Sequence, residues 1–195
     1  MKRDVCDAKA AIRSRMRELR RLVPADSKKA AETAICENLF RRISAAGPRV
    51  IAIYLATPEE LSLDELVRRL AELPEPPALV SPRWNGKEYV LAPLRLEGGA
   101  IDPASLRRGP MNVRESVLNG GMAPEKVDFW VVPGLAFTLD GGRLGYGGGW
   151  YDRLLAAANP DAKIFAPALP FQILPDLPRE EHDLCIDSPV TENML

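Results

Sequence analysis

The first quarter of the chain carries apolar residues at helical spacing, which predicts two amphipathic helices. In residues 8–23 the apolar side chains recur every three to four positions among arginines, and Pro24 ends the pattern. In residues 27–45 apolar side chains recur every fourth position until Gly47-Pro48 stops the helix. Each helix therefore has one apolar face to bury and one polar face to expose.

Short apolar runs follow, which predict buried strands. Residues 49–56 read RVIAIYLA, a run typical of a strand that is covered on both faces. Ser62 and Glu65 form a capping-box pattern for a third helix, which runs to about residue 73, and a fourth helix is predicted over 150–158. Further strands are predicted at 78–82, 87–93, 128–132, 163–169 and 184–187. The first two of these are expected to pair as a hairpin across Asn85-Gly86.

Strands that alternate with helices predict an α/β fold in which a largely parallel sheet is flanked by helices. We expect one domain over residues 1–195. Ligands of such folds bind at the carboxyl ends of the strands, and Glu60 and the loop around Arg143 both follow predicted strands. Residues 95–123 are irregular and too long for an inert connection, so we expect this segment to shape a site.

Composition narrows the classes of partner. The net charge is −1, which argues against nucleic acid and against a membrane surface. No apolar stretch has the length of a membrane span, and the three cysteines are scattered without metal-ligand spacing. The cysteines therefore favour a reducing, cytoplasmic compartment. We also expect a monomer with small-molecule substrates. The single histidine, His182, makes a histidine-based catalytic triad a poor fit unless His182 itself serves.

The most informative segment is 128–153, DFWVVPGLAFTLDGGRLGYGGGWYDR. It predicts a buried strand, a turn, and a glycine-rich loop that opens a helix near Gly148; six of the nine residues 141–149 are glycine. Without side chains in the way, backbone N–H groups can approach an anion closely. Arg143 and Arg153 add positive charge, and Asp152 offers a hard oxygen to a metal ion. The first hypothesis is therefore a nucleotide phosphate with Mg²⁺.

Glycine spacing alone is also compatible with an ordinary tight turn. The loop lacks the Gly-Lys-Ser/Thr of a Walker A motif. It is also not a dinucleotide fingerprint, because no strand directly precedes it and no acidic residue follows at the expected distance.

As a whole, PGLAF followed by RLGYGGGWYDR resembles the signature of the 5-formyltetrahydrofolate cyclo-ligase family, also called 5,10-methenyltetrahydrofolate synthetases. The likeness extends from Lys9 to about Glu192. It implies a fold akin to the sugar-phosphate isomerases and CoA transferases. It also implies an ATP-dependent ring closure: the N5-formyl oxygen attacks the γ-phosphate, N10 attacks the resulting imidate phosphate, and phosphate leaves. Because the substrate supplies both nucleophiles, no protein nucleophile is expected.

The resemblance also implies roles for individual residues. Lys9 and Arg13 match a K-x-x-[LI]-R pattern that contacts ATP in relatives; the alternative is a solvated basic helix face. The ATP loop corresponds to Arg143, Leu144, Gly145, Tyr146, Gly147, Gly148, Gly149, Trp150 and Tyr151. Folate contacts are implied for Leu55, Glu60 and the part of that loop from Tyr146 to Trp150. Asp152 and Asp183 match Mg²⁺-proximal acids, although Asp152 is also typical of a helix first turn and Glu60 of a solubilising loop.

Three positions depart from the family pattern. Trp150 stands where relatives usually have Tyr. The family's G-x-x-G-I-x-E-P segment corresponds to residues 109–116, where Asn112 replaces a glycine and Ser116 replaces the proline. Glu115 of this segment is retained, and Arg114 is interpreted as an added surface charge. Two alternatives stay open: a non-catalytic folate or nucleotide binder, and an enzyme of the same fold that acts on a phosphorylated sugar.

Overall fold

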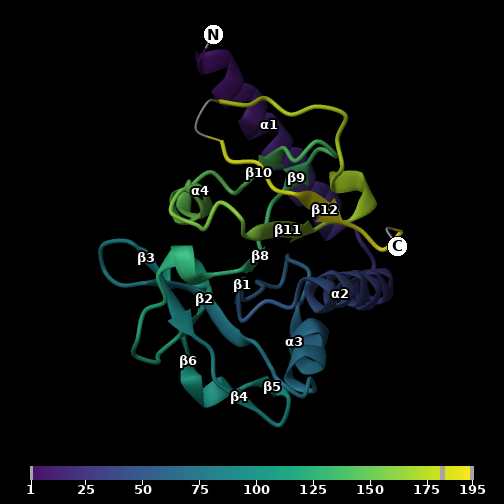
Figure 1. Cartoon of the computed structure of the whole chain (residues 1–195). Coiled ribbons are helices and arrows are strands. Elements are labelled where there is room, and N and C mark those ends of the chain that lie inside the picture. Colours follow the sequence, from purple (N-terminus) through teal and green to yellow (C-terminus); the bar gives the residue numbers. More distant parts are fainter. Residues whose placement is uncertain (1, 181–182, 194–195) are drawn as a thin grey trace.

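A computed structural model describes residues 2–180 and 183–193. Its centre is a six-stranded sheet in the order β12-β11-β8-β1-β2-β3 (Figure 1). Its strands are β1 (Val50–Ile53), β2 (Ala78–Trp84), β3 (Tyr89–Pro93), β8 (Phe129–Val131), β11 (Lys163–Pro167) and β12 (Ser188–Val190). Neighbouring strands pair in parallel except β2 and β3, which form the predicted antiparallel hairpin. The prediction of a largely parallel sheet is confirmed.

The described residues form four α-helices: α1 (Lys2–Arg21), α2 (Ala25–Ala46), α3 (Asp64–Ala71) and α4 (Trp150–Leu155). Of these, α2, α3 and α4 pack on the sheet. Strand β1 shows how both faces are covered, because successive side chains of a strand point to opposite sides. Ile51 and Ile53 pack in one core with side chains of α2 and α3, whereas Ala52 between them packs in a second core with Leu154 and Leu155 of α4. Figure 1 shows α2 and α3 together on one side of the central strands and α4 on the other.

Helix α1 packs elsewhere, against a short antiparallel hairpin of β9 (Ala136–Phe137) and β10 (Arg143–Leu144) (Figure 1). Met16 of α1 is fully buried with Leu135, Ala136 and Leu144. The sequence pattern did not indicate this hairpin: residues 143 and 144, predicted as part of the glycine-rich loop, form β10, and the loop continues from residue 145 to 149. Helix α1 therefore lies alongside the segment for which the sequence predicted phosphate binding.

The segment 95–123 is more regular than the sequence suggested. It contains two small antiparallel hairpins and two short 3-10 turns. The hairpins pair β4 (Leu96–Glu97) with β5 (Ala100–Ile101), and β6 (Leu106–Arg108) with β7 (Arg114–Ser116). The turns are η1 (Pro103–Ser105) and η2 (Pro110–Asn112); η3 (Pro124–Lys126) and η4 (Pro170–Gln172) lie elsewhere in the chain.

Two local predictions were wrong. The last strand is β12 rather than 184–187, because Ile186 and Asp187 donate their N–H groups to Gly141 and Ile164 in an irregular approach to the sheet edge. The capping box does not form: α3 begins at Asp64, whose N–H donates to Ser62 Oγ at 3.1 Å, and Glu65 is held by arginines on the same helix. In residues 2–180 and 183–193, no helix is both long enough and apolar enough to cross a bilayer.

The Glu65 contacts predict a pH-dependent contribution to stability. Hydrogen bonds from Arg68 and Arg69 lower the pKa of Glu65 from 4.5 to about 2. Since the folded-state pKa is depressed, the contribution is present above pH 4.5 and is lost as the pH falls toward 2. Glu65→Gln should therefore lower the free energy of unfolding at pH 7 by less than about 1 kcal/mol, because the pair is partly exposed. Urea titrations at pH 7 and pH 3 should show the difference shrinking; the exposed Glu75→Gln serves as control, and a difference unchanged by pH would contradict this assignment.

Candidate active site

Two cavities meet at the glycine-rich loop. The first, called here the apolar cavity, is lined by Tyr54, Leu55, Glu60, Tyr89, Tyr146, Tyr151 and neighbouring residues. The second, the charged cavity, is lined by Lys9, Arg13, Glu180, Asp183 and the loop backbone at Gly145 and Gly147. Four residues line both cavities: Arg143, Gly148, Gly149 and Asp152. The loop is therefore a shared wall, and a ligand in either cavity would contact it.

The loop backbone explains why glycine occupies this wall. Gly147 and Gly149 have φ angles of 105° and 63°, in the left-handed region that favours glycine. A Cβ on Gly148 would lie 2.4 Å from Nε1 of Trp150, so any side chain there would displace the indole. Helix α4 begins at Trp150, where the helix over 150–158 was predicted to begin, and it ends earlier, at Leu155; Gly149 is its N-cap.

The basic face of α1 contacts this loop instead of solvent. Lys9 is 5% exposed, and its Nζ donates to Glu180 Oε2 at 2.8 Å and to Asp183 Oδ2 at 2.6 Å. Arg13 donates from Nε to the Gly145 carbonyl at 2.9 Å. The alternative of a purely solvated helix face is therefore wrong for these two residues. Burial opposes the charge on Lys9, but the hydrogen bonds with Asp183 and Glu180 outweigh it and raise the pKa of Lys9 above its ordinary value.

A buried arginine connects the two ends of the glycine-rich segment to the preceding strand region. The side chain of Arg143 is 2% exposed, and its Nη2 donates to Asp152 Oδ1 at 2.5 Å. Its Nη1 donates to the Pro133 carbonyl at 3.3 Å. Because Asp152 is the counter-ion of a buried guanidinium as well as a cavity-lining carboxylate, it has a structural role beside the predicted metal role.

Asp152 and Asp183 lie at the same cavity although they are far apart in sequence. Within the described residues no group of three or more His, Cys, Asp or Glu side chains could hold a metal ion. A Mg²⁺ ion usually takes one or two carboxylates and completes its shell with water and substrate phosphate, so this pair has the donor chemistry for a metal bound with a nucleotide. His182 lies outside the described residues.

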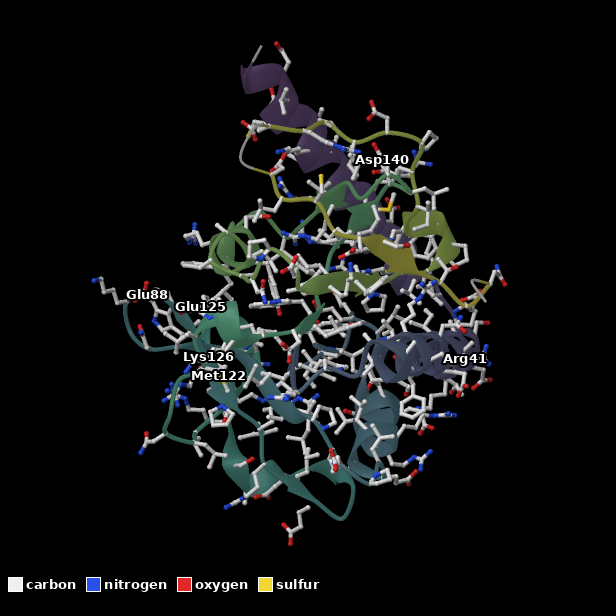
Figure 2. The ribbon with its side chains drawn as sticks, viewed as in Figure 1. Arg41, Glu88, Met122, Glu125, Lys126 and Asp140 are labelled. Atoms are coloured by element: carbon white, nitrogen blue, oxygen red, sulfur yellow. The ribbon has the colours of Figure 1, made fainter. Side chains whose placement is uncertain are left out.

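The segment that carries Asp183 is fixed to the hairpin below the loop. Arg179 donates to Thr138 Oγ1 at 2.9 Å and to Asp140 Oδ1 at 2.5 Å. Figure 2 labels Asp140, at the turn that joins β9 and β10. The Glu180 N–H then donates to Asp183 Oδ2 at 2.7 Å, so the carboxylate that contacts Lys9 is also held by its own backbone.

Glu60 follows the end of β1 and belongs to the apolar cavity. Its side chain accepts hydrogen bonds on Oε2 from the Thr57 N–H at 2.8 Å and from Thr57 Oγ1 at 2.9 Å, and the residue is 8% exposed. The interpretation as a solubilising loop residue fits Glu59, whose exposed carboxylate pairs with Arg21, and does not fit Glu60. A buried, oriented carboxylate is a strong acceptor for ring N–H and amino groups.

Tyrosines and a tryptophan form the other walls of this cavity. Burial, with the Glu60 charge as the second cause, raises the pKa values of Tyr54, Tyr146 and Tyr151, so these phenols stay neutral. Trp150 packs edge-on against Tyr89, with ring centroids 4.9 Å apart, and the Arg153 guanidinium lies 4.2 Å from its ring centroid. The indole that replaces the usual tyrosine is therefore fixed by packing.

Sequence reasoning missed several lining residues. Tyr54, Tyr89 and Glu180 carried no motif, and Arg114 was taken for a surface charge although it lines the apolar cavity. Arg17 also lines this cavity; its place in the four-residue series after Lys9 and Arg13 was a signal that could have identified it.

The departures at 112 and 116 are accommodated locally. Asn112 has φ 61°, the left-handed geometry that the glycine of relatives allows, and Asn adopts it more readily than most residues. Ser116 is buried, and its hydroxyl donates to the Pro93 carbonyl at 2.6 Å, which connects β7 to β3. Neither substitution removes the segment from the apolar cavity, since Val113 and Arg114 line it.

The backbone at Asn112 gives a stability prediction. Asn112→Ala should lower the free energy of unfolding by about 1 kcal/mol, because a Cβ without a compensating polar group is strained at this φ, whereas Asn112→Gly should be nearly neutral. Urea titration of both variants tests this, with Asn119→Ala on the same exposed segment as control. Equal destabilisation by Ala and Gly at position 112 would contradict the backbone explanation.

Comparison with known proteins is consistent with this geometry. A model of the 5-formyltetrahydrofolate cyclo-ligase family matches residues 5–192. The chain is 25% identical over 200 residues to 5-formyltetrahydrofolate cyclo-ligase of Mus musculus (97% of this chain, 96% of that protein). It is 27% identical over 186 residues to that of Mycolicibacterium smegmatis (94% and 93%). The NMR structure of Aquifex aeolicus 5,10-methenyltetrahydrofolate synthetase superimposes with a TM-score of 0.78 at 29% identity, covering 95% of this chain and 90% of that one. The chain therefore belongs to the 5-formyltetrahydrofolate cyclo-ligase family.

Proposed function

We propose that this protein uses Mg²⁺ and ATP to cyclise 5-formyltetrahydrofolate to 5,10-methenyltetrahydrofolate, releasing ADP and phosphate. The observation that carries the proposal is the pair of cavities that share the wall of Arg143, Gly148, Gly149 and Asp152. We propose that residues 1–195 act as one domain, because segments from Cys6 to Asp183 line the two cavities together, and that the protein acts as a monomer.

In the proposed reaction the N5-formyl oxygen attacks the γ-phosphorus of ATP and ADP leaves. N10 then attacks the formyl carbon of the imidate phosphate, the C–O bond breaks, and the departing phosphate takes up the proton that N10 loses. Both nucleophiles belong to the folate, so the protein has to align two ligands and stabilise phosphate charge. The thin glycine wall supports this alignment, since no side chain separates the cavities at Gly148 and Gly149.

The residues proposed to bind folate and those proposed to bind the nucleotide line different cavities. In the apolar cavity, Glu60 would accept hydrogen bonds from the pterin, and Leu55 and Trp150 would contact its ring. In the charged cavity, Lys9 and Arg13 would face the phosphates beside the loop backbone. Asp152 and Asp183 would hold Mg²⁺, which would neutralise phosphate charge.

The direct test follows absorbance in the methenyl product's band when purified protein is mixed with 5-formyltetrahydrofolate, MgCl₂ and ATP. The band should grow only when ATP and the metal are both present, and excess EDTA should abolish its growth. A flat trace from folded protein that still binds 5-formyltetrahydrofolate in calorimetry would overturn the catalytic proposal and favour a non-catalytic binder. If the protein bound a sugar phosphate in calorimetry and did not bind 5-formyltetrahydrofolate, the result would favour an enzyme of the same fold that acts on a phosphorylated sugar.

A further inference from the structure

Four basic residues follow one another along the face of α1 that meets the cavities: Lys9, Arg13, Arg17 and Arg20. Their spacing of four, four and three residues places them on one side of the helix. Lys9 contacts Glu180 and Asp183, and Arg13 donates to Gly145. Arg20 donates to the Gly134 carbonyl at 2.5 Å and to the Tyr146 hydroxyl at 2.6 Å. Arg17 differs: among the described residues its side chain has no hydrogen-bond or ion-pair partner.

Arg17 also differs in the cavity it lines. Lys9 and Arg13 belong to the charged cavity, whereas Arg17 belongs to the apolar cavity and not to the charged one. A second arginine, Arg114 of β7, lines the same apolar cavity. It too has no side-chain hydrogen bond or ion pair with any residue that the structure describes. Elements far apart in sequence thus bring two unpaired guanidinium groups to one cavity.

The charges at this cavity are not balanced by the protein. Its other lining cation, Arg143, is paired with Asp152, and the remaining lining carboxylate, Glu60, is held by Thr57. Arg17 and Arg114 are half-buried, as is Val113 beside them, while Glu60, Tyr54 and Leu55 are buried. The cavity therefore combines a buried acceptor, Glu60, with two half-buried guanidinium groups that have no counter-ion among the described residues. Guanidinium groups that are partly withdrawn from water without a counter-ion favour an anion that comes with the ligand.

We infer that Arg17 and Arg114 bind the glutamate carboxylates of the folate substrate and so determine its affinity. This inference rests on the proposed function, because the folate substrate carries a matching group for each kind of side chain that lines the cavity. Its pterin has N–H donors for Glu60, its aminobenzoyl ring is apolar, and its glutamate carries two carboxylates. A guanidinium fork matches a carboxylate in a bidentate geometry, which a lysine does not reproduce.

The experiment compares two ligands by isothermal titration calorimetry without ATP. One is 5-formyltetrahydrofolate; the other is its analogue in which methylamine replaces glutamate, so that the amide stays and both carboxylates are lost. Arg17→Gln and Arg114→Gln should each weaken binding of 5-formyltetrahydrofolate about tenfold, the usual effect of losing one charge-assisted contact. Binding of the methylamide should change less than twofold. Arg17→Lys and Arg114→Lys should recover part of the affinity, because they restore the charge without the fork.

The control is Arg15→Gln, an exposed arginine on the same helix, which should bind both ligands as the unmodified protein does. The inference would be overturned if the arginine variants lost affinity for both ligands equally, or lost affinity for neither. A raised KM for ATP with an unchanged folate Kd would place Arg17 at the nucleotide and would also overturn it. The two proposals fail separately: a protein that binds with the expected discrimination but forms no product refutes only the catalytic proposal. Turnover that is insensitive to the arginine variants refutes only the present inference.

Discussion

Asp152→Asn is expected to lower kcat/KM for ATP by about 10²–10³-fold, the usual cost of removing one preorganised electrostatic contact to a developing charge. The carboxylate lines both cavities and is the proposed link between the loop and Mg²⁺. Activity should be recovered only in small part by raising MgCl₂, because an amide oxygen is a weaker ligand than a carboxylate. The assay is the ATP-dependent growth of the methenyl band over a range of MgCl₂ concentrations.

The same variant should also lose stability, because Asp152 is the counter-ion of the buried Arg143. Asn keeps an acceptor oxygen but loses the charge, so the expected decrease in the free energy of unfolding is about 1.5–3 kcal/mol. Urea titration measures this separately from activity. Asp161→Asn, at an exposed turn after α4, is the control and should alter neither quantity. Near-normal turnover by Asp152→Asn would refute the metal assignment.

Glu60→Gln is expected to raise the Kd for 5-formyltetrahydrofolate by about 10²-fold, because two hydrogen bonds from the pterin would lose the charge of their acceptor. Burial increases the effect, since water does not replace the lost interaction in an enclosed site. Gln retains the shape of the side chain and an oxygen that can accept from Thr57, so the loop after β1 should stay in place.

Calorimetry with 5-formyltetrahydrofolate measures this effect, and KM for ATP provides an internal comparison that should change far less. The neighbouring Glu59→Gln is a matched control, because Glu59 is exposed and pairs only with Arg21 on the surface among the described residues. If Glu59→Gln and Glu60→Gln weakened binding equally, a general charge effect would explain the result and the pterin contact would be refuted.

Local patterns predicted most of the fold. The helices α1 and α2, the continuous strand β1 and the β2–β3 hairpin could be predicted because their periods and turn residues are encoded over a few positions. Predictions failed where a distant segment decides the outcome. The last strand is β12 and not 184–187, because the N–H groups of Ile186 and Asp187 donate to the carbonyls of Gly141 and Ile164. Glu65 does not cap α3, because Arg68 and Arg69 of the same helix bind its carboxylate.

The sequence by itself determined the alternation of strands and helices, the glycine-rich loop and the residue types at the candidate site, because each depends on a pattern of neighbouring residues. Only the tertiary structure decided their electrostatic state. Lys9 is buried against Glu180 and Asp183, 171 and 174 positions away, and Arg143 is buried against Asp152. The same folding leaves Arg17 and Arg114 unpaired among the described residues at one cavity. Whether a charge is solvated, neutralised or left for a ligand depends on contacts between distant segments, and a local pattern carries no information about these.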